Sequence, residues 1–216
     1  QGKIHIVEPG LGEIVQKAVA DGLLKAVTKP EPADAFLIAV PTPFKGNHEP
    51  DVSYIKAVSK ALAPVLKKGD TVILESTSPV GTTEQMVEWL SDSRPDLKFP
   101  HENSDEDIDV YVAYCPERVL PGQVIRELVE NDRIIGGITD ECSNKAIDVY
   151  KIFVKGDLVK TNARTAEMSK LTENAFRDVN IAFANELSLI SERLNINVWE
   201  LIALANRHPS VNILQP

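Results

Sequence analysis

The sequence is short of cysteine and of positive charge, and both shortages exclude classes of protein. Its 216 residues include two cysteines, and 23 Lys and Arg stand against 32 Asp and Glu. Two cysteines without CxxC or Cys/His spacing predict neither a disulfide framework nor a zinc site, so we expect a reducing compartment, the cytoplasm. A net charge of −9 argues against nucleic-acid binding, which requires a basic surface.

Long apolar segments are also lacking. No apolar run approaches the roughly 20 residues that a helix needs to cross a bilayer. The first residues, QGKIHIVEPG, contain no basic stretch followed by an apolar one. We therefore expect no membrane segment and no signal peptide. The acidic stretch HENSDEDID (101–109) is interpreted as a solvated loop rather than a cation site, and no metal site is predicted.

Short apolar runs alternate with amphipathic segments over the first 162 residues. The predicted strands are 34–41, 70–77, 109–116, 132–137 and 157–161, and the predicted helices are 51–66, 82–91 and 140–154. Strands that are apolar almost throughout and alternate with helices are typical of a parallel sheet with helices on both faces. The pattern predicts an α/β, doubly wound, Rossmann-like domain over residues 1–162.

From Ala163 onward the pattern becomes helical. Apolar residues recur at steps of three or four, and neither proline nor glycine occurs between 163 and 208. This predicts one long helix over 163–194 and a second helix over 197–208 that packs back on it. Apolar residues also lie off the main stripe, so we expect one face against the chain itself and one against a second subunit. Residues 163–216 are predicted to be an all-α segment that forms a homodimer through the long helix.

A Gly-x-Gly pattern near the start looks like a phosphate-binding turn between a strand and a helix. Gly10 and Gly12 have the expected spacing, but Val15 stands where the third glycine belongs. Glu8 would also repel a phosphate. We interpret this segment as an ordinary entry into a helix.

Two neighbouring strands are predicted to end in hydroxyl-bearing loops. AVPTP (39–43) places Thr42 between two prolines, and ESTSPVGTTEQ (75–85) presents Ser76 and Thr77. Each loop alone could be simple turn chemistry, but together, at the carboxyl ends of adjacent strands, they favour a ligand crevice. Thr82 and Gln85 have capping-box spacing, which predicts that the next helix starts there.

A third strand ends in YCPERVLPG (114–122). Glu117 and Arg118 could form a surface ion pair or lie in the crevice, where the glutamate would handle protons and the arginine would hold substrate oxygens. Cys115 follows an apolar strand and Cys142 lies near a helix start, so both thiols are interpreted as structural.

Three polar residues open the long helix. Lys170, Asn174 and Arg177 are spaced by four and three, so they share a helix face. They could form a solvated face. Alternatively, a partly buried Lys170 could act on a substrate hydroxyl or hold an oxyanion.

Five motifs together carry a family resemblance. VPTP, STSPVG, CPERVLPG, KLTENAFRDVNIAFANEL and NVWELIALANRHPSVNIL, in this order, resemble the UDP-glucose/GDP-mannose dehydrogenase family over nearly the whole chain. The resemblance implies a two-step, NAD-dependent oxidation of the C6 alcohol of a UDP-sugar to a carboxylate. Arg118, directly after the Pro-Glu pair, favours a 2-acetamido sugar, N-acetylmannosamine.

The same resemblance implies roles for individual residues. Catalysis falls to Thr77, Glu117, Lys170 and Asn174, of which Glu117 assists water and proton handling and the last two stabilise oxyanions. The implied cofactor contacts are Thr42, Pro43, Ser76 and Thr77. The implied substrate contacts, besides Lys170 and Asn174, are Arg118, Val119, Arg177, Arg207 and His208, the last two from a neighbouring subunit.

Some family features are missing from this sequence. The resemblance leads us to expect an earlier strand–turn–helix unit with the dinucleotide fingerprint, a catalytic cysteine in a Gly-Gly-x-Cys stretch, and a C-terminal nucleotide-binding domain. We therefore expect an internal fragment that is inactive alone, with Ser210 at a position where the family motif has arginine. Two alternatives stay open: a two-electron dehydrogenase of the 6-phosphogluconate or β-hydroxyacid type, and a non-catalytic dimerisation module.

Overall fold

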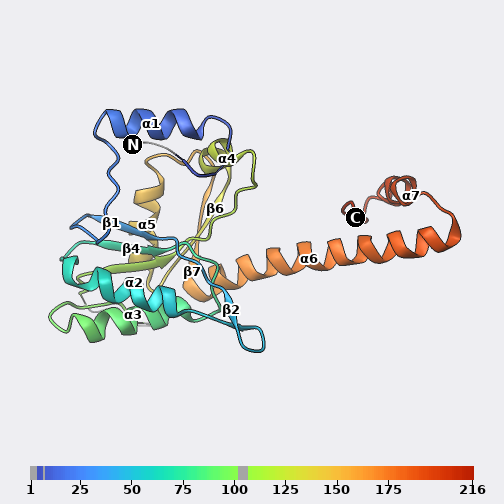
Figure 1. Cartoon of the computed structure of the whole chain (residues 1–216). Helices are drawn as coiled ribbons and strands as arrows, with labels where there is room; N and C mark the ends of the chain where they lie inside the picture. Colours follow the sequence, from blue (N-terminus) through green and yellow to red (C-terminus); the bar gives the residue numbers. More distant parts are fainter. Residues whose placement is uncertain (1–3, 7, 102–106) are drawn as a thin grey trace. The chain divides into compact units, whose positions relative to one another are not determined.

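The computed structural model describes residues 4–6, 8–101 and 107–216 (Figure 1). It divides the chain into two compact units, Gln1–Met168 and Ser169–Pro216. Most of the acidic stretch 101–109, predicted to be a solvated loop, lies outside the described residues. In the part of the chain that is described, no helix combines the length and the apolar character required to span a membrane.

The first unit is built on a five-stranded sheet. Its strands are β1 (Ala35–Ile38), β4 (Thr71–Leu74), β5 (Tyr111–Tyr114), β6 (Arg133–Gly137) and β7 (Leu158–Asn162), in the spatial order β1-β4-β5-β6-β7. All five coincide with predicted strands. The pairs β1–β4, β4–β5 and β6–β7 are parallel.

One pairing departs from the prediction of a fully parallel sheet. β6 runs antiparallel to β5, with Tyr114 opposite Gly136. The connection from β5 to β6 contains only the short helix α4 (Val124–Glu130), which the sequence did not predict. A parallel strand would require a crossover back along the sheet, whereas an antiparallel strand can start at the edge where β5 ends. An apolar pattern predicts that a strand is buried, but it does not predict whether the strand runs parallel or antiparallel to its neighbour.

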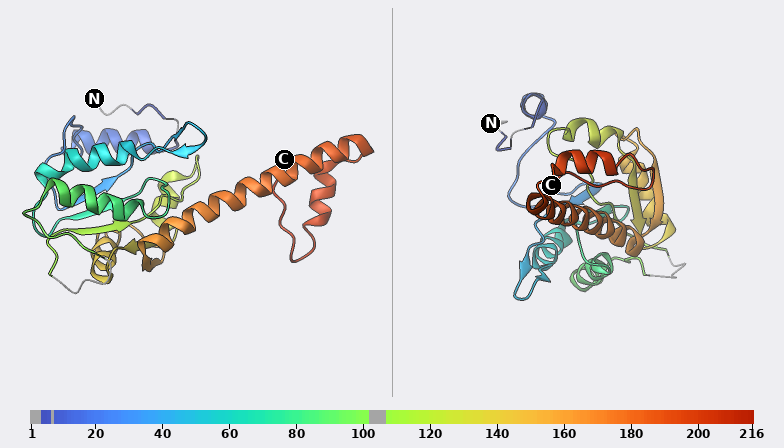
Figure 2. Two further views of the ribbon diagram at one scale, coloured as in Figure 1. Left: turned by 90° about the horizontal axis from the view of Figure 1, so that it is seen from below. Right: turned by 90° about the vertical axis from the view of Figure 1, so that its right-hand side faces the viewer.

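Helices cover both faces of the sheet (Figures 1 and 2). They are α2 (Ser53–Leu62), extended by a 3-10 turn (Ala63–Val65), α3 (Thr82–Ser93) and α5 (Asp140–Tyr150); α1 (Leu11–Ala20) and a small hairpin of β2 (Phe44–Lys45) and β3 (Glu49–Pro50) complete the unit. Alternate residues of β4 enter different cores: Val72 and Leu74 pack with α2 and α3, whereas Ile73 packs with α5. The predicted helix-covered sheet is therefore confirmed.

The start of α3 contradicts the predicted capping box. The N-cap residue is Gly81, which has no side chain, and the Thr82 hydroxyl instead donates to the carbonyl of Pro79 at 2.7 Å. The cap comes from Glu167, a fully buried carboxylate that accepts from Gly81 N–H at 2.6 Å and from Thr83 N–H at 2.8 Å. It also accepts from the Thr83 hydroxyl at 2.6 Å. A residue distant in sequence thus replaces the local motif, because glycine cannot cap with a side chain.

The second unit is helical, as predicted. It contains most of α6 (Ala163–Leu194) and all of α7 (Val198–Ala205). Asn197 caps α7, accepting from Trp199 N–H at 3.0 Å. The chain then returns to α6, where the Asn180 amide donates to the Asn212 carbonyl at 2.9 Å and accepts from Leu214 N–H at 2.8 Å. These bonds fix the last residues of the chain on the long helix.

Candidate functional site

The loops after β1 and β4 are bonded to each other. Thr42 donates its hydroxyl to the carbonyl of Thr77 at 2.8 Å. The Ser76 hydroxyl donates to the carbonyl of Val40 and accepts from its N–H, both at 2.8 Å. Since β1 and β4 are parallel neighbours, these hydroxyls share the carboxyl edge of the sheet, as the sequence predicted. The Ser76 hydroxyl therefore joins the two loops through both of its hydrogen bonds.

Glu117 lies at the third strand tip, after β5. Its Oε1 accepts from Arg118 N–H at 2.6 Å, and its Oε2 lies 3.4 Å from the guanidinium of Arg133. The side chain is 38% exposed, so the carboxylate is within reach of a ligand. The guanidinium of Arg118 donates to the carbonyl of Asp132 at 3.1 Å. Because β5 pairs in parallel with β4, the Glu117 loop follows the same edge as Thr77.

A buried polar cluster behind Glu117 was not predicted. It comprises the buried Arg133 and Tyr150, at the ends of β6 and α5, and the partly buried Glu75, directly after β4. The Tyr150 hydroxyl donates to Glu75 Oε1 at 2.6 Å, and the Arg133 guanidinium lies 5.1 Å from the Tyr150 ring centre. Burial raises the pKa of Glu75, against the Tyr150 hydrogen bond and the charge of Arg133, which lower it. The sequence signal that could have indicated this cluster was Arg133, a charged residue at the start of the apolar strand DRIIGG.

The two thiols are structural, as predicted. Both Cys115 and Cys142 are fully buried and unpaired by disulfide. Burial raises the pKa of Cys115 to about 11, so its thiolate is scarce at neutral pH. Cys142 accepts from Val112 N–H at 3.4 Å. Neither thiol is placed to attack a ligand.

The N-terminal glycines do not form a phosphate cradle. Gly10 precedes α1 in a left-handed conformation, with φ of 75°. The carboxylate of Glu8 accepts from Gly122 N–H at 2.9 Å and from Val124 N–H at 2.8 Å. The carboxylate thus binds the backbone donors at the start of α4, and its negative charge lies two residues before Gly10 in the sequence, which agrees with our interpretation of an ordinary helix entry.

Five predicted site residues lie in the second unit, whereas Pro43 and Val119 belong to the first. Lys170, Asn174 and Arg177 are on α6, and the last two line a shallow depression on that helix. Arg207 and His208 follow α7 and are exposed. Their approach to the threonine and glutamate loops stays a prediction.

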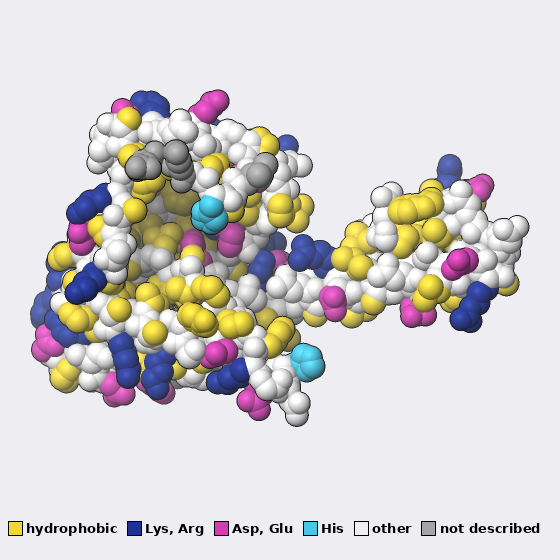
Figure 3. All heavy atoms as spheres, viewed as in Figure 1, with side chains coloured by type: hydrophobic (Ala, Val, Ile, Leu, Met, Phe, Trp, Pro, Cys, Tyr) yellow, Lys and Arg dark blue, Asp and Glu magenta, His cyan; other side chains and the backbone are white. Residues whose placement is uncertain are grey.

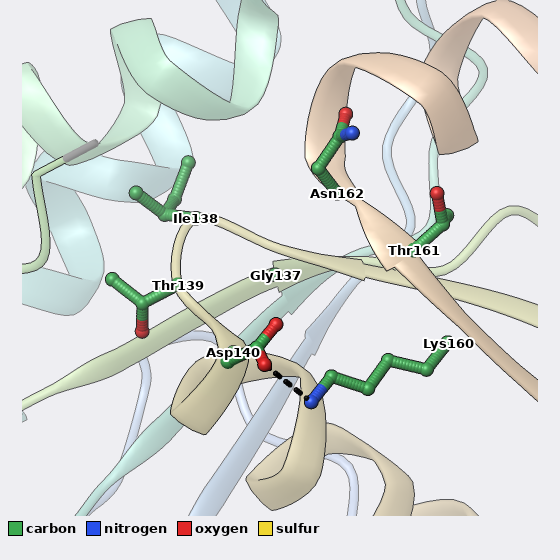
Figure 4. A pocket seen from close by; sticks show the side chains of 7 residues that line it. All are labelled: Gly137, Ile138, Thr139, Asp140, Lys160, Thr161 and Asn162. Atoms are coloured by element: carbon green, nitrogen blue, oxygen red, sulfur yellow. Dashed lines mark ion pairs between the residues drawn. The ribbon is translucent and has the colours of Figure 1, made fainter. Parts of the chain in front are cut away.

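A separate cavity of about 540 Å³ lies at the other edge of the sheet (Figure 4). It is lined by residues 137–140 and 160–162, none of which was predicted to be functional. Lys160 and Asp140 form an ion pair there, with 3.1 Å between Nζ and Oδ2. The two charges satisfy each other, so this cavity offers no net charge to a ligand. Among residues 4–6, 8–101 and 107–216, no cluster of three or more potential metal ligands occurs.

Hydroxyl and carboxylate groups at the carboxyl tips of β1, β4 and β5 define a class of protein. Open α/β sheets bind nucleotides at this edge, and the helical second unit follows directly. The arrangement is that of a nucleotide-binding α/β protein.

Comparison with known proteins identifies the family. Residues 1–154 match the NAD binding domain of the UDP-glucose/GDP-mannose dehydrogenase family, and residues 164–216 match its central domain. The chain belongs to this family, and its first unit carries the family's NAD-binding domain.

The relatives that match the whole chain are about twice its length. The chain is 70% identical to UDP-N-acetyl-D-mannosamine dehydrogenase of Campylobacter jejuni, covering all of this chain and 53% of that protein. It is 67% identical to NDP-N-acetyl-D-galactosaminuronic acid dehydrogenase of Ralstonia nicotianae, covering 51% of it. The solved structure of UDP-D-ManNAc dehydrogenase from Pyrococcus horikoshii aligns over the whole chain and 50% of its own, with a TM-score of 0.91 and 43% identity. The chain thus spans about half the length of these relatives.

Proposed function

We propose that the full-length protein carrying this sequence oxidises the C6 alcohol of a UDP-sugar to a carboxylate with NAD as the electron acceptor. The proposed substrate is UDP-N-acetyl-D-mannosamine, the sugar named for the 70% identical relative. The observation that carries the proposal is the alignment of Thr42, Thr77 and Glu117 on three neighbouring strand tips within the family's NAD-binding domain.

The loops after β1 and β4 fit a cofactor. They are rigid, because hydrogen bonds join Thr42 to Thr77 and Ser76 to Val40. Thr42, Pro43, Ser76 and Thr77 would hold NAD, which accepts a hydride when bound. The loops then present their backbone groups in a fixed geometry, which lowers the ordering cost of binding.

Glu117 is the proposed proton-handling group. Its carboxylate is partly exposed and anchored through both oxygens. It can accept a proton from the substrate hydroxyl or from water at the same strand tips. Arg118, Val119 and Arg177 would contact the sugar or its phosphates, and Arg207 and His208 would reach the site from a second subunit.

Lys170 and Asn174 are proposed to stabilise negative charge on the reacting oxygen. Glu167, Lys170 and Asn174 follow one another at steps of three and four on α6, so they lie on one side of that helix. Glu167 faces the loop after β4, to which its carboxylate is bonded. We propose that the ammonium and the amide meet the reacting oxygen in the full-length protein.

The covalent part of a four-electron oxidation needs an accessible thiol. A thiolate must attack the aldehyde before the second hydride leaves. Cys115 and Cys142 are fully buried, so neither suits this step. We expect the full-length protein to supply the thiol outside the present 216 residues.

An NADH assay tests the function. With UDP-N-acetyl-D-mannosamine and NAD, the full-length protein should form two NADH per sugar consumed, and the 216-residue chain none. One NADH per sugar would instead favour the two-electron dehydrogenase alternative. Robust NADH formation by the 216-residue chain would refute the requirement for an outside thiol, and its absence in the full-length protein would favour a non-catalytic module.

We also propose that α6 forms a homodimer. Hydrophobic side chains gather on the surface of the second unit (Figure 3). Those on α6 that are at least half exposed are Phe176, Val179, Phe183, Leu189, Ile190 and Leu194. Several large apolar side chains exposed along one helix are typical of a protein interface.

Substitution on this surface should dissociate the dimer. Phe183→Glu would bury a charge in the interface, so we expect sedimentation equilibrium to show a dimer for the unmodified chain and a monomer for the variant. Asn185→Glu, at an exposed neighbouring position, is the control and should remain dimeric. A monomeric unmodified chain at micromolar concentration would rule out this interface.

A further inference from the structure

A guanidinium is buried behind Glu117. Arg133 opens β6, and its side chain is 4% exposed. In the described part of the chain, its ion-pair partner is Glu117, whose Oε2 lies 3.4 Å from both Nη1 and Nη2. A buried charge is stable only when it is paired and hydrogen-bonded. The fold therefore ties the position of Arg133 to the carboxylate of Glu117.

The Arg133 guanidinium has further contacts besides Glu117. Its Cζ lies 5.1 Å from the ring centre of Tyr150, and the Tyr150 hydroxyl donates to Glu75 Oε1 at 2.6 Å. Nη2 also points to the carbonyl of Leu128 at 3.5 Å. Tyr150, which is itself hydrogen-bonded to Glu75, thus packs against the arginine in addition to its pair with Glu117.

Both oxygens of the Glu117 carboxylate consequently have a partner. Oε1 accepts from Arg118 N–H at 2.6 Å, and Oε2 faces Arg133. Without the second contact the carboxylate could turn about its side-chain bonds. A displacement of about 1 Å in a catalytic group can cost on the order of 10²-fold in rate.

We propose that Arg133 is a positioning residue, which orients the Glu117 carboxylate for proton transfer at the strand tips. This proposal rests on the proposed function, in which Glu117 accepts the proton. Arg133 itself touches neither substrate nor cofactor. Its effect on the reaction passes through Glu117 alone.

Kinetics of the full-length protein test this dependence. Arg133→Met should lower kcat about 10- to 100-fold and leave the KM for NAD within about twofold, because a misplaced base slows chemistry rather than cofactor binding. Arg133→Lys should recover part of the loss, since it keeps the charge but not the two-pronged donor. Arg126→Met removes an arginine with an exposed ion pair and is the matched control, expected to keep full activity.

A double substitution distinguishes positioning from general stabilisation. If Arg133 acts through Glu117, Glu117→Gln combined with Arg133→Met should be no slower than Glu117→Gln alone. If the fold-losses in kcat of the two single variants multiply in the double variant, the proposal is overturned. An Arg133→Met protein with the kcat of the unmodified enzyme would also overturn it. Should Arg133→Met fail to fold, the same comparison is made with Arg133→Lys.

A spectroscopic measurement keeps this proposal separate from the proposed function. In ¹H–¹⁵N spectra of the 216-residue chain, the Arg133 Nε–H resonance should move in Glu117→Gln and stay in place in Arg126→Met. An unmoved resonance in Glu117→Gln would contradict the pairing itself. Absence of UDP-sugar-dependent NADH in the unmodified full-length protein would instead refute the proposed function and leave the pairing to be decided by the spectra.

Discussion

Replacing Lys170 by alanine in the full-length protein is expected to lower kcat for UDP-N-acetyl-D-mannosamine oxidation about 10²- to 10³-fold. Removal of one preorganised donor to an oxyanion has an effect of this size in other enzymes. Because the proposed contact forms as charge develops, kcat and kcat/KM should fall together, whereas the KM for NAD should change little. Steady-state kinetics measure both.

The control for this substitution is Lys151→Ala. Lys151 is 63% exposed and pairs with Asp148 on the surface, so its removal should leave the kinetic constants unchanged. A Lys170→Ala enzyme with the kcat of the unmodified protein would show that Lys170 belongs to a solvated helix face. That was the alternative interpretation of its spacing.

The second large effect is expected at Glu167. Glu167→Ala leaves two backbone N–H groups and one hydroxyl of Gly81 and Thr83 without their acceptor. A buried unsatisfied donor costs about 1–3 kcal/mol, so we expect the free energy of unfolding to fall by about 2–4 kcal/mol in urea titrations. Glu84→Ala removes a partly exposed pair with Arg164 and should cost less than about 1 kcal/mol. Equal losses in the two variants would contradict the capping role.

The stability contribution of Glu167 should depend on pH. Burial raises the pKa of Glu167 above its ordinary value of 4.5, against the hydrogen bonds from Thr83 and Gly81, which lower it. A carboxyl group with a raised folded-state pKa stabilises the fold most when protonated, so this contribution is lost as pH rises above 4.5. The unfolding free energy of Glu167→Gln should therefore fall further below that of the unmodified protein near pH 4.5 than at about pH 7. A deficit that grows toward neutral pH would mean that the fold prefers the carboxylate.

Much of the first unit could be predicted because its central strands, β4, β5 and β6, are largely buried. DTVILEST is apolar enough to locate β4, and all four residues of that strand are buried. The direction of β6 could not be predicted, since it depends on how the chain between 115 and 132 returns to the sheet. The cap of α3 was missed for a similar reason: its acceptor, Glu167, is 86 residues from Gly81.

The candidate site was predictable where its groups follow strand ends. Thr42, Thr77 and Glu117 each follow an apolar run within a few residues, and parallel pairing brings such residues to one edge. Arg133 and Tyr150 could not be found this way, because one opens a strand and the other closes a helix. Their relation to Glu117 exists only in the folded chain.

We propose above all that Lys170 and Asn174 contact the nucleotide sugar together with the residues at the tips of β1, β4 and β5. A crystal structure of the full-length protein with UDP-N-acetyl-D-mannosamine bound tests it most directly. We predict the Lys170 ammonium and the Asn174 amide within hydrogen-bonding distance of the sugar, in a cleft that Thr77 and Glu117 also line. A bound sugar that contacts Thr77 and Glu117 while both α6 side chains point into solvent would contradict the account.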